Sequence, residues 1–335
     1  MTKKPFYINT PSIAAIGELR DELAADVYRT PVLRCPAIEE QINSSNGQVM
    51  AKLEFLQRTG TFKARGALAV LKSLDSAQLE AGVTAVSAGN HAIATAFAAR
   101  AVGTTAKVVM IPTANPARIE ACKAYGAELV MADTVHDAFA LAREIEKQEG
   151  RFFVHPFEGE LVATGTGTVG LEICEQCEDV DVVIVPVGGG GLIGGMSNAI
   201  KQLRPDVEVI GVEPTGADSM RRSIELGEPQ SIDKVQTIAD SLGAPYALPY
   251  SFELTRSNTD RLVLVSDDEL RLAMGFLFRS MKIAVEPACA ATTAAILGPL
   301  RDELRGKNVV LTMCGSNIDW NTFAAQVRFA DANAD

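Results

Sequence analysis

Lys63 lies in a stretch rich in glycine and threonine, residues 59–67, and this setting makes it a candidate reactive amine. Residues 48–55 before it have the composition of a short strand, and residues 64–74 after it carry apolar side chains at helical spacing. We therefore expect Lys63 at a strand-to-helix transition, where free backbone N–H groups attract anions. A lysine at the start of a helix that points into solvent would explain this stretch alone equally well.

A second polar stretch, Ser87-Ala88-Gly89-Asn90-His91, follows a predicted strand at residues 83–86 and opens a predicted helix at residues 92–102. Its free N–H groups and small polar side chains could hold a carboxylate. The structural alternative is helix capping by Ser87 or Asn90, which this stretch by itself favours. His91 has apolar neighbours, and we interpret it as a structural histidine rather than a base.

Four consecutive glycines, Gly188, Gly189, Gly190 and Gly191, separate the apolar run at residues 182–187 from Leu192 and a predicted helix. Glycines let the backbone approach an anion closely, and the helix that follows points its N-terminus at it. The loop matches neither a Walker loop nor the dinucleotide fingerprint, because the residues and spacing differ. We interpret it as a site for a single phosphate. The alternative, a tight turn, needs only one or two glycines.

A fourth stretch, residues 313–317, follows the last predicted strand and contains Cys314. This cysteine would place a weakly hydrogen-bonding thiol at the end of the strand. On its own, the stretch favours a core cysteine before a turn.

The composition limits the classes of function. The chain has 335 residues, 47% of them apolar, and a formal net charge of -11, which argues against nucleic acid as a partner. Its six cysteines are dispersed, and the Cys174/Cys177 pair lacks the second pair or nearby histidine of a zinc site. We find no signal peptide and no apolar run of membrane-spanning length. We therefore expect a cytoplasmic protein that does not bind membranes.

Predicted strands and helices alternate along the chain with short connections, which is typical of α/β folds. We predict two doubly wound domains with mainly parallel sheets. The smaller, substrate-capping domain would span residues 82–158, and the larger, cofactor-binding domain residues 1–81 and 159–335. A ligand would lie in the cleft between them, at the carboxyl ends of the strands.

Taken in order, the four stretches resemble the fold-type II pyridoxal-phosphate enzymes, and most closely the serine/threonine dehydratase and serine racemase group. The resemblance extends from about residue 30 to about residue 320. Further stretches match the group at residues 155–157, 165–172, 237–240 and 285–287. This resemblance implies pyridoxal 5'-phosphate as cofactor, an amino acid as substrate and a homodimer.

The resemblance also implies roles by position. Lys63 would hold the cofactor as an imine, Phe62 would pack against its ring, and Asn90 would bind its phenolic oxygen. The phosphate would lie on Gly188, Gly189, Gly190, Gly191 and Leu192, and Cys314 would face the ring nitrogen. Ser87, Ala88, Gly89 and His91 would form the substrate carboxylate loop. Relatives with a divalent cation have ligands where this chain has Glu213, Ala217 and Ser219, but Ser219 replaces a carboxylate, so we expect a weak metal site or none.

Three positions depart from the group's usual pattern: Thr166 within Gly-Thr-Gly, Ser241 after Asp240, and the segment at residues 158–160. All three lie where the resemblance places the substrate or the cofactor. The identity of the substrate therefore stays open.

The resemblance implies elimination of water from a β-hydroxy amino acid, with serine or threonine as default substrates, to give a 2-oxo acid and ammonia. A neutral thiol at the ring nitrogen suits rapid loss of a β-hydroxyl better than transamination. Another 3-hydroxy amino acid, or racemisation, is the alternative on this scaffold, and a non-catalytic binding protein is a remote one. Racemases of the group carry a serine hydroxyl where this chain has Ala88, whose methyl group cannot donate a proton.

Overall fold

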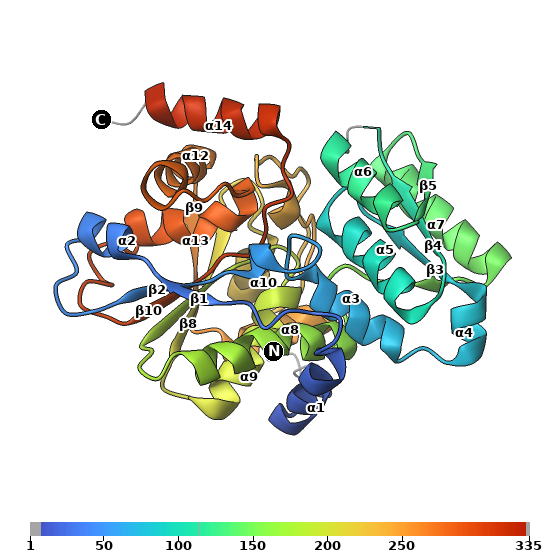
Figure 1. Cartoon of the computed structure of the whole chain (residues 1–335), viewed down its shortest axis with the longest axis horizontal. Coiled ribbons are helices and arrows are strands. Elements are labelled where there is room, and N and C mark those ends of the chain that lie inside the picture. Colours follow the sequence, from blue (N-terminus) through green and yellow to red (C-terminus); the bar gives the residue numbers. More distant parts are fainter. Residues whose placement is uncertain (1–7, 113, 333–335) are drawn as a thin grey trace.

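The computed structural model describes residues 8–112 and 114–332, and it contains two β-sheets (Figure 1). The larger sheet has six strands in the order β1-β2-β10-β7-β8-β9, and the smaller has four in the order β5-β4-β3-β6. Every neighbouring pair is parallel except β1 and β2. The expected mainly parallel α/β fold is therefore confirmed. The strands are β1 Val32–Arg34, β2 Val49–Lys52, β3 Val83–Val86, β4 Ala106–Met110, β5 Glu128–Met131, β6 Phe152–Phe153, β7 Val182–Pro186, β8 Glu208–Pro214, β9 Arg261–Val265 and β10 Val309–Thr312.

Helices cover both faces of each sheet (Figure 1). In the smaller sheet, adjacent β4 residues pack in opposite directions: Val108 joins the apolar cluster under α5, and Val109 joins the one under α7. In the larger sheet, α13 packs on β7, β8, β9 and β10, and α9 packs on β7. The α-helices are α1 Ile13–Leu23, α2 Pro36–Gln41, α3 Lys63–Lys72, α4 Ser76–Ala81, α5 Asn90–Val102, α6 Pro116–Ala124, α7 Val135–Glu149, α8 Glu160–Gln176, α9 Gly191–Leu203, α10 Ser219–Leu226, α11 Pro249–Asn258, α12 Asp267–Phe276, α13 Pro287–Leu297 and α14 Trp320–Ala332.

The glycines of helix α8 serve helix packing and do not interrupt the helix. A Cβ at Gly165 would lie 2.6 Å from the Arg65 carbonyl oxygen, and one at Gly170 would lie 2.5 Å from the Met196 carbonyl oxygen. These glycines let α8 approach both α3 and α9 closely. Short 3-10 turns occur at Glu54–Leu56 and Asp240–Leu242, and a π-helical turn at Leu277–Met281.

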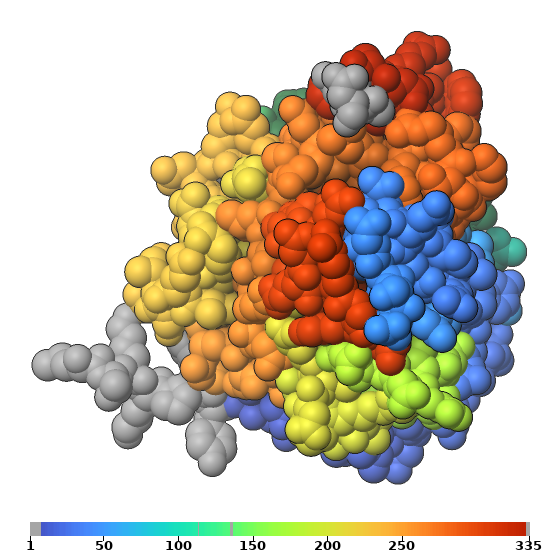
Figure 2. Space-filling model, turned by 90° about the vertical axis from the view of Figure 1, so that its left-hand side faces the viewer, coloured from blue at the N-terminus to red at the C-terminus, as the bar shows by residue number. Residues whose placement is uncertain are grey.

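All four strands of the smaller sheet lie between residues 83 and 153. They therefore fall within the segment 82–158 that we expect to form the capping domain, and the exact boundaries stay a prediction. Figure 2 shows the side of the molecule that lies on the left in Figure 1, away from the smaller sheet. There, segments that are far apart in the sequence pack side by side, because residues near 45 lie against residues near 300. Among the described residues, no helix is both long and apolar enough to cross a bilayer.

Candidate active site

The candidate active site is a cavity of about 280 Å³ bordered by both sheets. Val86 at the end of β3 and Met110 at the end of β4 border it from the smaller sheet, and Gly189 after β7 borders it from the larger one. A smaller, adjoining cavity shares Lys63, His91 and Pro156 with it. The carboxyl ends of parallel strands therefore converge on one space, as expected for open α/β sheets.

Lys63 is the first residue of α3, and its side chain lies in both cavities. Its Nζ donates a hydrogen bond to the Pro156 carbonyl oxygen and lies 5.2 Å from the centre of the Phe62 ring. Burial lowers the pKa of Lys63 to about 8, against the opposing influence of Glu286. A useful fraction of this amine is therefore uncharged near neutral pH, which is the state a nucleophile requires.

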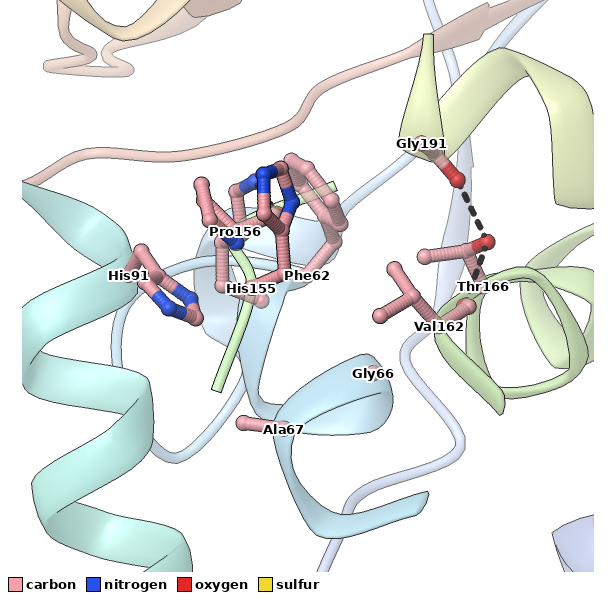
Figure 3. A pocket seen from close by; sticks show the side chains of 10 residues that line it. Phe62, Gly66, Ala67, His91, His155, Pro156, Val162, Thr166 and Gly191 are labelled. Carbon is pink, nitrogen blue, oxygen red and sulfur yellow. Dashed lines mark hydrogen bonds between the residues drawn. The ribbon is translucent and has the colours of Figure 1, made fainter. Parts of the chain in front are cut away.

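Two neutral histidines border the same space as Lys63 (Figure 3). Burial, and then the charge of Lys63, lower the pKa of His91 to about 3 and that of His155 to about 4. His91 Nε2 donates to the Val154 carbonyl oxygen over 2.8 Å, and His155 Nδ1 accepts from the Phe157 and Glu158 N–H groups. These contacts are consistent with a structural histidine, and the role of His91 stays a prediction.

The turn before Lys63 is attached to the end of β10. Phe62 N–H donates to the Cys314 carbonyl oxygen over 3.2 Å, and Ser316 N–H donates to the Gly60 carbonyl oxygen over 3.0 Å. The Cys314 side chain is buried, and a hydrogen bond with Cys289 together with burial raises its pKa, so the thiol is neutral. The first and the fourth stretches of the sequence analysis therefore meet in space.

A buried ionic cluster holds the start of α3 in place. The Arg65 guanidinium, fully buried, donates to both oxygens of Glu54 at 2.8 and 2.9 Å and to both oxygens of Glu172 at 2.7 and 2.9 Å. Lys52 Nζ lies 2.5 Å from the second Glu172 oxygen. Two cations and two carboxylates thus neutralise one another beneath the helix that presents Lys63.

The glycine loop is a cradle with no room for side chains. A Cβ at Gly189 would lie 2.5 Å from the Phe157 ring, and one at Gly191 would lie 2.7 Å from the Phe157 carbonyl oxygen. Gly190 adopts a φ of +90°, which side chains rarely allow. The loop opens α9, whose first N–H groups have no partners within the helix, and Leu192 is buried in its first turn. Figure 3 shows the Gly191 carbonyl accepting a hydrogen bond from Thr166 over 2.7 Å.

The stretch from Ser87 to His91 lines the cavity at the N-terminus of α5. Ser87 Oγ accepts from the Gly89 N–H over 3.0 Å, so this serine shapes the loop before the helix. The Asn90 amide donates to Glu286 over 2.7 Å and to Ser241 over 3.1 Å. Ala88 borders the cavity with a methyl group, and no hydroxyl stands at that position.

Sequence reasoning missed Arg118, which lines the cavity and links α6 to two loop segments of the larger part of the chain. This buried arginine of α6 donates to Asp240 and, through Nε, to the Asn317 carbonyl oxygen over 2.9 Å. A Cβ at Gly89 would lie 3.1 Å from its guanidinium. Nothing local in the sequence marks Arg118, because helix-surface arginines are common and its partners are more than 120 residues away.

The residues compared with a cation site have other partners. Both carboxylate oxygens of buried Glu213 accept backbone N–H groups, from Met220 at 2.9 Å and Arg221 at 2.8 Å. Ser219 Oγ donates to a backbone carbonyl, and Ala217 is buried. Among the described residues, no group of three or more histidine, cysteine or acidic side chains could hold a metal ion.

Comparison with known proteins identifies the family. A family model described as pyridoxal-phosphate dependent enzyme matches residues 23–315. The chain belongs to this family. It is 53% identical to the phenylserine dehydratase of Ralstonia pickettii over 94% of this chain and 95% of that protein. It is 38% identical to the catabolic L-threonine dehydratase TdcB of Escherichia coli K12, over 96% of this chain and 97% of that protein.

Solved structures agree with this assignment. Maize serine racemase superposes with a TM-score of 0.89 at 29% identity, covering 98% of this chain and all of that one. The processed form of threonine deaminase isoform 2 from Solanum lycopersicum superposes with a TM-score of 0.88 at 29% identity, covering 98% of this chain and 91% of that one. The resemblance inferred from the four stretches is therefore confirmed.

The cofactor of this family is pyridoxal phosphate, and the residues of this chain fit it. The glycine loop exposes bare backbone where any Cβ would clash, Gly189 borders the cavity, and the loop opens α9, whose first N–H groups have no partners within the helix. Lys63 supplies an amine of lowered pKa that could bind an aldehyde, and Cys314 supplies a neutral thiol for a ring nitrogen. The individual role of each site residue stays a proposal.

Proposed function

We propose that this protein is an ammonia-lyase that removes water from a β-hydroxy amino acid and releases a 2-oxo acid and ammonia. The observation that carries the proposal is the position of Lys63, whose amine of pKa about 8 borders the same cavity as Ser87 and Gly189. Relatives named as phenylserine and threonine dehydratases support the same reaction.

Each group of residues has a separate role in the proposed reaction. The N-terminus of α5, with Ser87, Gly89 and neighbouring residues, binds the substrate carboxylate. Lys63 Nζ removes the proton from Cα, because its lowered pKa makes the uncharged, proton-accepting form accessible near neutral pH. The cofactor, when bound, supplies the electron sink for the pair left on Cα. The neutral thiol of Cys314 provides no negative charge to hold a proton on the ring nitrogen, which favours prompt loss of the β-hydroxyl.

A screen of β-hydroxy amino acids for release of 2-oxo acid and ammonia tests this function. We expect turnover by the protein loaded with pyridoxal phosphate, with the two products in equal amounts. Protein that stays colourless when pyridoxal phosphate is added would indicate a non-catalytic binding protein. Protein that binds the cofactor yet releases no 2-oxo acid from serine, threonine or phenylserine would refute the proposal.

Racemisation is the second candidate, favoured by the similarity to maize serine racemase. It requires a proton donor on the face of Cα opposite Lys63. Ala88 borders the cavity where racemases of the group carry a serine, and its methyl group cannot donate a proton. Elimination is therefore the reaction that this cavity supports better.

We also propose that the protein acts as a homodimer in the cytoplasm. Exposed apolar side chains support association, since Trp320 is 70% and Leu226 67% exposed. Six free cysteines, five of them buried, are consistent with a reducing compartment. Sedimentation analysis of the purified protein measures the first expectation, and fractionation of the source cells measures the second.

A further inference from the structure

Three aromatic rings border the cavity and remain partly exposed there: Phe139 of α7, Phe157 before α8 and Tyr246 of the loop before α11. The ring centres of Phe157 and Tyr246 are 6.3 Å apart, within the range of favourable aromatic contacts. Phe139 comes from the smaller sheet's helices and Tyr246 from the larger part of the chain. Tyr246 is distant in sequence from the other two rings, and only the fold brings it to their cavity.

Phe139 and Tyr246 also border a second, neighbouring groove, which is lined further by Arg143, Phe153 and Leu248. Residues that line both spaces stand between them. We call Phe139 and Tyr246 the two-ring wall. The wall therefore limits the depth of the cavity available to a substrate.

The cavity lining has a polar part and an apolar part, which suit different ends of a substrate. Lys63 and the stretch from Ser87 suit the amino and carboxylate groups of an amino acid. Apolar residues, including Val86, Ile111 and Ala138, make up much of the remaining lining. A small β-substituent such as a methyl group would leave the aromatic surfaces in contact with water, whereas an aromatic substituent would cover them.

A charged β-substituent finds no available counter-ion in this lining. Apart from Lys63, the arginine or lysine among the described residues that line this cavity is Arg118, and its guanidinium already bonds both oxygens of Asp240 and the Asn317 carbonyl. A substrate carboxylate at Cβ would have to displace Asp240, which borders the same cavity. The lining therefore disfavours acidic substituents.

We propose that the two-ring wall, with Phe157, forms a subsite that receives an aryl group on the substrate's Cβ, and that Phe139 and Tyr246 determine specificity. This inference rests on the proposed function and names its substrate class: 3-aryl-3-hydroxy amino acids rather than threonine or serine. The aryl ring packs against aromatic side chains while the α-amino acid part remains at Lys63 and Ser87.

Kinetics of the holoenzyme with phenylserine and threonine test the subsite. The wild type is expected to have the higher kcat/KM for phenylserine, and Phe139→Leu, which keeps an apolar side chain but removes the ring, to reduce that preference by about three- to ten-fold. Leu248→Ala is the matched control, because Leu248 borders the neighbouring groove and does not line the candidate active site, and the preference should stay unchanged. Phe139→Ala, which also opens the wall, should reduce the preference further.

Binding of L-phenylalanine and L-alanine gives a readout without turnover, because neither has a β-hydroxyl. We expect the holoenzyme to bind phenylalanine at least about ten-fold more tightly than alanine, and Phe139→Leu to narrow this ratio. Equal affinities, or a variant that loses threonine and phenylserine activity alike, would overturn the subsite. Turnover of threonine with no preference for phenylserine would do the same and leave the proposed function intact. Absence of turnover with every β-hydroxy amino acid would instead refute the proposed function, while the binding ratio still decides the subsite.

Discussion

Replacement of Arg65 by methionine should destabilise the protein strongly and in a pH-dependent way. Arg65 is fully buried and makes four hydrogen bonds to Glu54 and Glu172, at 2.7 to 2.9 Å. Its removal leaves two buried carboxylates with Lys52 as their remaining cation, a net charge of one in the core. Breaking a buried pair in this way costs about 3–5 kcal/mol of unfolding free energy.

The pH dependence follows from Glu54. Burial raises the pKa of Glu54, but Arg65, together with Lys52 and Thr30, outweighs it and holds the pKa below its ordinary value in the native protein. Glu54 therefore stabilises the wild type above its unfolded pKa, and that contribution is lost as pH falls through the native pKa. Without Arg65, burial raises the pKa of Glu54, so the variant loses stability as pH rises. The difference between wild type and variant should be largest at about pH 8 and shrink toward about pH 5.

Urea denaturation followed by circular dichroism at both pH values measures this effect. Lys123→Met is the matched control, because Lys123 and its partner Glu120 are exposed, and it should change the unfolding free energy by less than about 0.5 kcal/mol. Combining Arg65→Met with Glu54→Gln should recover part of the loss. A cost below about 1 kcal/mol, or an equal cost at both pH values, would refute the reasoning about buried charge.

The remaining predictions concern the site. Lys63→Ala should abolish turnover and leave the circular dichroism spectrum unchanged, and borohydride reduction with peptide mapping should label Lys63; a label on another lysine would contradict the assignment. Gly190→Asp should weaken cofactor affinity by about ten-fold or more. Its Cβ would lie 2.5 Å from Met220 at a φ of +90°, and its charge would repel the phosphate. Full cofactor content after purification would argue against a phosphate role for the loop. Activity should survive chelation, since Glu213 already accepts two backbone N–H groups; a loss reversed only by Mg or Ca would show a required cation. Ala88→Ser should raise the share of D-serine formed from L-serine in heavy water, and comparable D-serine and pyruvate from the wild type would defeat the argument about Ala88.

Much of the site could be predicted because its parts are local. A glycine run after a strand, or a polar stretch before a helix, indicates the backbone conformation at that place. In the structure, Gly190 has a positive φ, and there is no room for a Cβ at Gly189 or Gly191. Apolar runs such as β7 likewise indicate a strand buried on both faces, hence a parallel sheet between helices.

Local patterns are less informative where one residue type has two structural uses, as glycine does in turns and at close contacts between helices. The glycines of α8 lie within a continuous helix, and Gly165 and Gly170 lie at close contacts with neighbouring backbone. The predicted helix at residues 64–74 begins one residue earlier, at Lys63, since Thr61 Oγ1 accepts the Lys63 N–H over 3.2 Å and helps to start the helix.

The sequence by itself predicted the fold class, which the structure confirms, and it proposed the reactive lysine and the phosphate loop, because each depends on neighbouring residues and on backbone geometry. Tertiary structure alone decided the pKa of Lys63, the neutralisation of Arg65, the link from Arg118 to Asp240, and the wall of Phe139 and Tyr246. These features depend on contacts between side chains that are distant in sequence, and the periodicity of apolar residues does not indicate such contacts. Their physical basis is burial, which acts only after the chain has brought the partners together.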